Sequence, residues 1–308
     1  MIIADITSAD TGGQSYKLTK GINTHTIHKA RSFVKVLNYI EFPYDILHGR
    51  HDIEYVKEYL QHTDIIHCHN KYRNLDGWGQ LNKSAKMVIH QHGRFPDKDL
   101  RSEIKKADEK RNAYRIVSTL NLLNYVDNDI NRWLPAPFFI KEMEQIKKEN
   151  FIPSTTRHPR KIKIAHSPTR RDYKNTDLLI ECVNKIPELD LVLIENKPYK
   201  EALRLKSMCD ITFDQMHLCY GNSGIEGWCF GQAVICQPTD TAREIIKTHI
   251  GYEPYIYATE DTLLSVLKEL TFDSGIRNHY AELGSKYIRQ WHDSKFVTQR
   301  IINIYENL

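Results

Sequence analysis

Short apolar runs alternate with stretches of helical spacing along the whole chain. In the first half the apolar runs span residues 2–6, 64–67, 86–90 and 114–118, and residues 16–20, 52–61 and 100–111 have helical patterns between them. Strands that alternate with helices indicate βαβ units and a parallel sheet. We therefore expect an α/β fold, with function gathered where the strands end at their carboxyl edge.

The second half repeats this pattern. Apolar runs at 161–165, 189–194 and 233–236, with a short one after Asp210, predict strands. Leu178, Leu179, Cys182, Val183 and Ile186 share one helical face, and residues 200–207, 260–270, 274–290 and 295–305 also predict helices, while 238–246 leads from a loop into another. A second α/β domain follows from this pattern.

The two halves meet in a polar stretch. Residues 141–150 are mostly charged, and residues 151–160 are rich in Pro, Thr and basic side chains, which is typical of a linker. We expect a first domain over residues 1–150, a second over 151–290, and a terminal helix within 291–308. A length of 308 residues fits two domains of about 150 each.

Composition narrows the setting. A hydrophobic share of 41% with 27% charged residues is typical of a soluble globular protein. No stretch approaches the roughly 20 apolar residues that span a bilayer, and the first residues lack the basic leader of a signal peptide. Six scattered cysteines fit buried thiols in a reduced, cytoplasmic setting. The net charge of +4 is compatible with a phosphate-rich ligand, an anionic membrane surface or nucleic acid.

A basic loop opens the second domain. Arg170, Arg171 and Lys174 precede a helix that begins near Asn175 or Thr176, either of which can serve as its N-cap. Cations at a helix N-terminus favour a bound phosphate through both charge and dipole. The alternative is a solvated basic loop.

A second candidate site lies in residues 209–237. A loop with Gly221 and Gly224 leads into a helix whose residues Ile225, Trp228 and Cys229 share one face. The unpaired amides at such a helix start can bind an anion. Glu226, in the first turn, can accept hydrogen bonds from sugar or ribose hydroxyls. The alternative is an ordinary loop–helix–strand connection, with Glu226 favourable against the helix dipole.

Imidazoles mark two strand ends in the first domain. His67 and His69 follow one strand, and His90 and His92 follow the next. Residues two apart in an extended chain point the same way, so the four rings can converge if the strands are neighbours. Such a cluster is compatible with zinc, although no Asp or Glu pattern completes a familiar metal site. A polar cluster without chemistry is the alternative.

The order of parts in residues 209–237 resembles the C-terminal signature of retaining GT-B glycosyltransferases of family 4. Glu226 takes the place of the second Glu of the Glu-x7-Glu pair, and residues 231–234 take that of Gly-x-Pro-Val. The chain departs from the signature at Leu218, where the first Glu would stand, and at Ala233, which replaces the proline. The dipeptide Asp214-Gln215 is similar to one found in a branch of the family.

Other segments carry the resemblance further. Lys174 matches the family's diphosphate-binding Lys, with Asn175 where Gly is usual, and its Arg partner corresponds to Arg170 or Arg171. The pair Gly12-Gly13 matches a glycine pair near the donor diphosphate, although both can simply form a turn; the full GxGxxG of a dinucleotide site is absent. Three further matches are His92-Gly93 beside the transferred sugar, His69-Asn70 at the preceding strand end, and residues 134–137 in a strand that leaves the first domain.

The resemblance implies a GT-B-like fold with two Rossmann-like domains facing each other across a cleft, the terminal helix packing back on the first. It implies a retaining, hexosyltransferase-like enzyme with a UDP- or GDP-sugar donor and no metal. Residues 127–129 spell Asp-Asn-Asp but follow a helical pattern, so we discount them as a metal motif. The amides of Gly221, Asn222, Ser223 and Gly224 would contact sugar or phosphate.

The resemblance does not identify the acceptor, which can be a glycan, a lipid, a protein or modified nucleic acid. Peripheral contact with a membrane depends on that acceptor. Three alternatives remain. One is a sugar-nucleotide epimerase or inverting transferase, for which no carboxylate base stands out in the first domain. Another is a non-catalytic sugar-nucleotide-binding protein, because the first Glu and the proline are missing. The last is a phosphate-binding regulator of nucleic acid, for which Tyr173 beside the basic loop gives little support.

Overall fold

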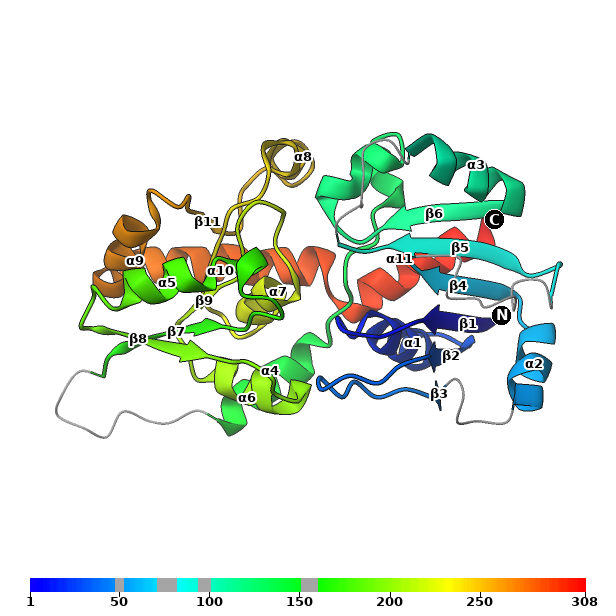
Figure 1. The fold of residues 1–308 in the computed structure, drawn as a ribbon, viewed down its shortest axis with the longest axis horizontal. Helices are drawn as coiled ribbons and strands as arrows, with labels where there is room; N and C mark the ends of the chain where they lie inside the picture. The colour runs from blue at the N-terminus through cyan, green and yellow to red at the C-terminus, as the bar shows by residue number, and fades with distance from the viewer. Residues whose placement is uncertain (48–52, 71–81, 94–100, 151–159) are drawn as a thin grey trace. The chain divides into compact units, whose positions relative to one another are not determined.

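The computed structural model describes residues 1–47, 53–70, 82–93, 101–150 and 160–308 (Figure 1). The chain divides into two compact units, here called unit 1 (Met1–Phe138 with Asp293–Leu308) and unit 2 (Phe139–His292). The structure thus groups residues 139–150 with unit 2, whereas we expected the first domain to end at residue 150. The expected linker at 151–159 lies outside the described residues.

Unit 1 contains a six-stranded sheet in the order β3-β2-β1-β4-β5-β6. Its strands are β1 (Ile2–Thr7), β2 (Lys29–Val34), β3 (Ile46–Leu47), β4 (Ile65–His69), β5 (Lys86–Gln91) and β6 (Ala113–Val117). Every pairing within it is parallel. Parallel sheets are buried on both faces, which explains why the short apolar runs predicted most of these strands.

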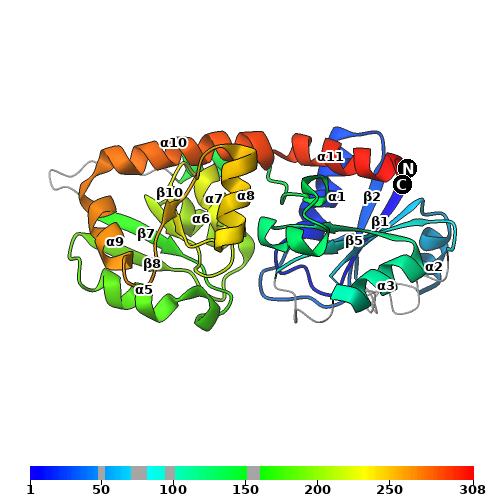
Figure 2. The same ribbon diagram turned by 90° about the horizontal axis from the view of Figure 1, so that it is seen from above.

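Helices cover both faces of this sheet. On one face α1 (Gln14–His25) and α11 (Ser294–Glu306) pack together, and Ile22 and Ile301 join Ile3 of β1 in one core (Figure 2). On the other face α2 (Ile53–Gln61) packs through Val56, in a core with Ala4. Because Ile3 and Ala4 are adjacent in a strand, they point to opposite faces. α3 (Arg101–Arg111) precedes β6.

The strand expected at residues 134–137 does not form. After the 3-10 helices η4 (Leu120–Tyr125) and η5 (Ile130–Arg132), the chain makes isolated bridges at Trp133 and Phe138. Pro135 and Pro137 lie between the bridges, and neither has an N–H to donate. A continuous ladder therefore cannot form along this segment.

Unit 2 contains a five-stranded parallel sheet in the order β11-β10-β9-β7-β8. Its strands are β7 (Ile162–His166), β8 (Leu189–Leu193), β9 (Ile211–Phe213), β10 (Ala233–Cys236) and β11 (Ile256–Tyr257). The helices are α4 (Ile140–Glu149), η6 (Asp172–Lys174), α5 (Thr176–Val183), α6 (Tyr199–Ser207), α7 (Asn222–Cys229), α8 (Asp240–Ile250), α9 (Leu263–Phe272) and α10 (Ser274–Trp291).

The core of unit 2 forms where helices pack on both faces of its sheet. On one face Leu179 of α5 and Leu267 of α9 pack against Ile211 of β9. On the other, α7 and α10 pack against each other and against β10. A Cβ added at Gly284 of α10 would lie 2.0 Å from Cδ1 of Trp228, so this close helix packing requires glycine there.

Three element predictions need correction. Residues 140–149 form α4 instead of belonging to a linker, and Ile140 and Met143, three apart, are its buried residues. α7 begins at Asn222, three residues before the expected start, so the glycine at 224 lies within the first helical turn. The sequence analysis also missed β2, β3 and β11.

All six cysteines are buried, as predicted. Among the residues that the structure describes, no helix combines the length and the apolar character needed to cross a membrane.

Candidate functional site

The strand order of unit 2 points to one edge of its sheet. β7 lies between β8 and β9, so the chain turns to opposite sides after β7 and β9. Ligands of open α/β sheets bind at such a switch point, beyond the carboxyl ends of the strands. His166 is the last residue of β7, Ser167 follows it, and Asp214 follows β9 directly. We call the side chains gathered here the strand-end site.

A buried carboxylate positions Lys174 at the strand-end site. The Nζ of Lys174 lies 2.9 Å from Oδ1 of Asp214, which is fully buried, and the Lys174 side chain is 15% exposed. The other Asp214 oxygen accepts from the backbone N–H of Gly221, at the start of α7. A Cβ added at Gly224 would lie 3.0 Å from Asp214 Oδ2, so a small residue is needed there. Asp214 thereby joins the lysine to the first turn of α7.

A second buried cation, which the sequence analysis missed, binds Glu226. Lys206 Nζ lies 2.6 Å from Glu226 Oε2 and 2.9 Å from Ser223 Oγ. Ser223 Oγ in turn lies 3.0 Å from Ser167 Oγ. The Lys206 side chain is 1% exposed, although a lysine in the last turn of a helix is usually solvated. The available signal was its spacing of three from Leu203, which places both residues on the buried face of α6.

The two arginines pair with other carboxylates. Arg170 donates to Asp172 at 2.5 Å and stacks on the ring of Tyr173. Arg171 donates twice to Glu195, at 2.7 and 2.6 Å. Both arginine side chains are at least half exposed. The three cations of the basic loop thus have three different carboxylate partners, and among them Lys174 is bound to a buried one.

The backbone at Asn175 explains the residue type there. Its φ is +50°, in the left-handed region that Gly adopts freely and Asn adopts more readily than most residues. Asn175 occupies the N-cap position of α5, but its side chain makes no capping bond and donates to Glu260 instead. A residue that tolerates positive φ therefore suits this position.

His166 links the two strand ends to α5. Its Nδ1 lies 3.0 Å from the carbonyl oxygen of Phe213, and its Nε2 lies 2.9 Å from Thr176 Oγ1. Burial lowers the pKa of His166 to about 4. The ring is therefore neutral near pH 7, with Nδ1–H donating to the carbonyl and Nε2 accepting from the hydroxyl.

The remaining predicted residues of unit 2 shape the turn before α7. Gln215 is buried, and its amide donates to the carbonyl of Cys219. Gly221 donates its N–H to Asp214, so this amide serves the protein itself. Asn222 and Ser223 lie in the first turn of α7, where helix amides have no partner within the helix.

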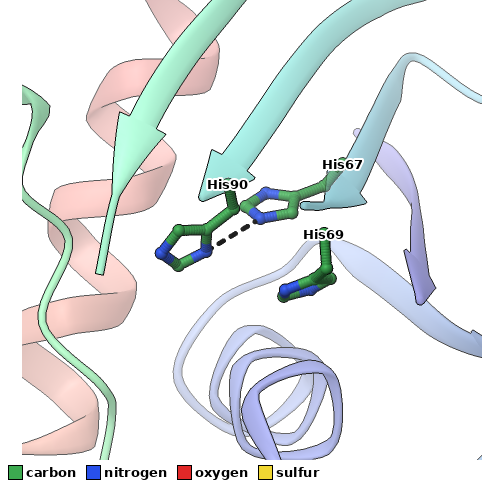
Figure 3. Close-up of side chains that lie close together, drawn as sticks. All are labelled: His67, His69 and His90. Atoms are coloured by element: carbon green, nitrogen blue, oxygen red, sulfur yellow. Dashed lines mark hydrogen bonds between the residues drawn. The ribbon is translucent and has the colours of Figure 1, made fainter. Parts of the chain in front are cut away.

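In unit 1 the predicted imidazoles do meet. β4 and β5 are neighbours in register, with His69 opposite His90. We call His67, His69, His90 and His92 the histidine cluster; Figure 3 shows three of its rings together. His67 Nε2 lies 3.2 Å from His90 Nδ1, and His69 Nδ1 lies 2.6 Å from His92 Nε2.

Two groups distant in sequence complete the surroundings of the cluster. His69 Nε2 lies 2.7 Å from Oδ1 of Asp5, which is fully buried on β1, and His67 Nδ1 lies 2.6 Å from the hydroxyl of Tyr305 on α11. Burial acts to raise the pKa of Asp5, but the charge of His69 and its hydrogen bond outweigh this and lower it. Burial also lowers the pKa of His67, to about 3.

The glycine pair of unit 1 lies in the loop between β1 and α1. Gly13 has φ +64°, and a Cβ there would lie 2.4 Å from the Phe42 ring, so both backbone and packing require glycine. The Asp10 carboxylate accepts from the amides of Gln14 and Tyr16 at 2.7 and 3.0 Å. A side-chain anion thus occupies the N-terminus of α1, where Gly12-Gly13 was expected to face a phosphate.

Comparison with solved structures gives matches over the full chain. The chain superposes on the Anabaena protein HepE in complex with UDP-glucose with a TM-score of 0.69 at 12% identity, covering 100% of this chain and 99% of HepE. Sucrose-phosphate synthase from Thermosynechococcus elongatus gives 0.66 at 11%, covering 100% and 98%. A glycosyltransferase from Rickettsia africae gives 0.66 at 12%, covering 99% and 98%.

Neither protein-family models nor curated protein sequences give a match. The structural likeness, at this low identity, establishes the fold. The chain has a GT-B-like α/β fold with two Rossmann-like units, and this prediction is confirmed.

Proposed function

We propose that this protein is a glycosyltransferase that moves a sugar from a nucleotide-sugar donor to an acceptor, with retention of anomeric configuration. Two observations on different levels support this. The fold is GT-B-like over the full chain, and one matching structure, HepE, holds UDP-glucose. The strand-end site of unit 2 also has the groups that such a donor requires.

Lys174 on its buried carboxylate is the observation that carries the proposal. An ammonium group has three N–H donors, and one of them lies on Asp214. The other two can bind diphosphate oxygens. Because Asp214 is buried and its other oxygen accepts from the Gly221 N–H, the cation is already oriented before the donor arrives. Fixed positive charge of this kind stabilises the charge that develops on a departing diphosphate without a metal, and we propose no metal for this step.

Glu226 is the proposed partner of the ribose hydroxyls. Its Oε2 is bound by Lys206, and its Oε1 makes no hydrogen bond to the part of the chain that the structure describes. Lys206 therefore holds the carboxylate in one orientation while leaving an acceptor for the ligand. The amides at the start of α7 would contact the sugar or phosphate.

The remaining roles rest on the family resemblance. Arg170 or Arg171 would move from its present carboxylate to the diphosphate, and His92 of unit 1 would border the sugar. The matching UDP complex favours a UDP-sugar over a GDP-sugar. We propose a cytoplasmic enzyme whose acceptor is a glycan, a lipid, a protein or modified nucleic acid. A lipid acceptor would bring the enzyme to a membrane surface.

A non-catalytic nucleotide-sugar-binding protein is the second candidate. Leu218 stands where the first Glu of the family pair would be, so one acidic contact to the sugar is missing. Such a protein would bind the donor as the enzyme does but would release no nucleoside diphosphate.

The test is an incubation of the full chain with UDP- and GDP-sugars and a panel of acceptors, with EDTA present. We expect release of UDP that depends on an acceptor, and a product with the donor's anomeric configuration by NMR. Lys174→Met should abolish release, whereas Lys185→Met, which breaks an exposed pair with Glu181 in the same unit, should not. Binding without release would favour the second candidate, and binding of no nucleotide sugar would refute both.

A further inference from the structure

We propose that His67, His69 and His90 bind a divalent transition-metal ion of the zinc class. One ligand nitrogen from each ring lies within 4.8 Å of the others, and all three side chains are buried (Figure 3). They lie at the carboxyl ends of the adjacent strands β4 and β5 in unit 1. All three residues belong to unit 1, and the proposal does not rest on the proposed function.

The outward nitrogens of two rings already have partners. His69 Nε2 is 2.7 Å from the buried Asp5 carboxylate, and His67 Nδ1 is 2.6 Å from the Tyr305 hydroxyl. Metal-binding histidines usually have such a partner on the nitrogen that does not bind the metal, which orients the ring and fixes its tautomer. The partners leave His69 Nδ1 and His67 Nε2 turned toward the other rings.

The spacing of the inward nitrogens fits one ion. Zinc binds imidazole at about 2.0–2.1 Å in a tetrahedral arrangement, which places two such nitrogens about 3.3 Å apart. His67 Nε2 and His90 Nδ1 are 3.2 Å apart. His69 Nδ1 lies 2.6 Å from His92 Nε2, which is too short for two ligands of one ion. That contact must open for His69 to bind the metal, a shift of one ring.

The type of ligand selects the type of ion. Imidazoles suit zinc, copper, nickel and iron, whereas magnesium and calcium require several oxygen ligands. The Asp5 carboxylate, buried beside His69, supplies negative charge close to the ion. Three protein ligands leave a fourth position open on a tetrahedral ion.

A bound ion would connect four elements of unit 1. It would join β4 and β5 directly, β1 through Asp5, and α11 through Tyr305. A ligand that binds the folded state raises its stability by about 2.7 kcal/mol when present at 100 times its dissociation constant. Metal removal should therefore lower the unfolding temperature of unit 1 and leave UDP binding at the strand-end site of unit 2 intact.

The experiment uses the untagged full chain, because a polyhistidine tag binds the same ions. After removal of metal with a chelator, the protein is titrated with Co²⁺ and with Zn²⁺. We expect one ion per chain, the visible d–d bands of tetrahedral cobalt, and zinc X-ray absorption dominated by imidazole nitrogen at about 2.0 Å. No retained zinc in the folded chain, or zinc bound mainly by other ligands, would overturn the proposal without any variant.

Variants locate the ion. His90→Gln should lose it, while His292→Gln, which removes a buried imidazole from unit 2, should retain it. His90→Cys should keep the cobalt and add a thiolate-to-cobalt charge-transfer band, which only a residue bound to the ion can produce. Equal metal content in the His90→Gln and His292→Gln variants, both folded by circular dichroism, would place the ion elsewhere and refute the site.

Discussion

The charges of Lys206 and Glu226, a buried pair, should be coupled far more strongly than those of an exposed pair at the same separation. The chain provides both. Lys206 Nζ and Glu226 Oε2 are 2.6 Å apart with side chains 1% and 10% exposed, and Lys185 Nζ and Glu181 Oε1 are also 2.6 Å apart with 52% and 66% exposed. Both pairs lie in unit 2. The two pairs thus share a unit and an N···O distance and differ strongly in burial.

The magnitude follows from what each single substitution leaves behind. Lys206→Met strands the Glu226 carboxylate in a site with little water, and removal of one partner from a buried pair typically costs about 3–5 kcal/mol. Glu226→Gln strands the ammonium in the same way. Removal of both charges leaves neither group uncompensated, so the double variant should cost less than the sum of the singles, with a coupling free energy of about 2–3 kcal/mol.

The assay is urea denaturation of the wild type, both single variants and the double variant, followed by circular dichroism. The same cycle at Lys185 and Glu181 is the control, for which exposed helix pairs predict a coupling of about 0.3–0.5 kcal/mol. Equal coupling in the two cycles would refute the argument that burial makes Lys206 a fixed support for Glu226.

Three further predictions concern unit 2. Gly284→Ala should destabilise the protein by about 1–3 kcal/mol, because the added Cβ would lie 2.0 Å from Trp228. The measurement is the unfolding temperature, which should fall. In an exposed helix the same change stabilises by roughly 1 kcal/mol, and a rise of that size would contradict the packing. Asn175→Gly should change the free energy of unfolding little, and Asn175→Val should lower it by about 1–2 kcal/mol, because φ is +50°; equal effects would argue against the left-handed backbone. Finally, burial lowers the pKa of His166 from 6.5 to about 4, so the unfolded chain takes up this proton first as the pH falls. The contribution of neutral His166 to the free energy of unfolding should be fully present above pH 6.5 and fall by roughly 3 kcal/mol toward pH 4. A His166→Gln variant with the same pH dependence as the wild type would contradict this.

Much of the fold could be predicted because buried parallel strands have a plain signature. All residues of β4 are buried, and its apolar start at Ile65 and Ile66 follows the polar residue Asp64 directly. β2 was missed because its first four residues alternate exposed Lys29 and Arg31 with the small buried residues Ala30 and Ser32, so that only Phe33 and Val34 are large and apolar. α4 was taken for a linker because its charged residues outnumber the two that it buries.

The candidate site divides in the same way. The histidine cluster could be anticipated, because residues two apart in a strand point to the same face of the sheet and the two strands are neighbours. Its partners could not, because Tyr305 is 238 positions from His67 in the chain. Lys206 was missed for a related reason. Helical spacing predicts that a residue is buried but does not identify its contacts, and the partner of Lys206, Glu226, lies on another helix. Contacts between elements depend on packing that local patterns do not contain.

In the proposed function Lys174, on its buried carboxylate, binds the diphosphate of a nucleotide-sugar donor. The direct measurement is calorimetric titration of UDP into the full chain in EDTA, compared with Lys174→Met and the control Lys185→Met. We expect binding by the wild type and the control and at least a tenfold loss in Lys174→Met, a difference of about 1.4 kcal/mol. UDP binding that is equally tight in Lys174→Met, or absent from the wild type, would contradict it.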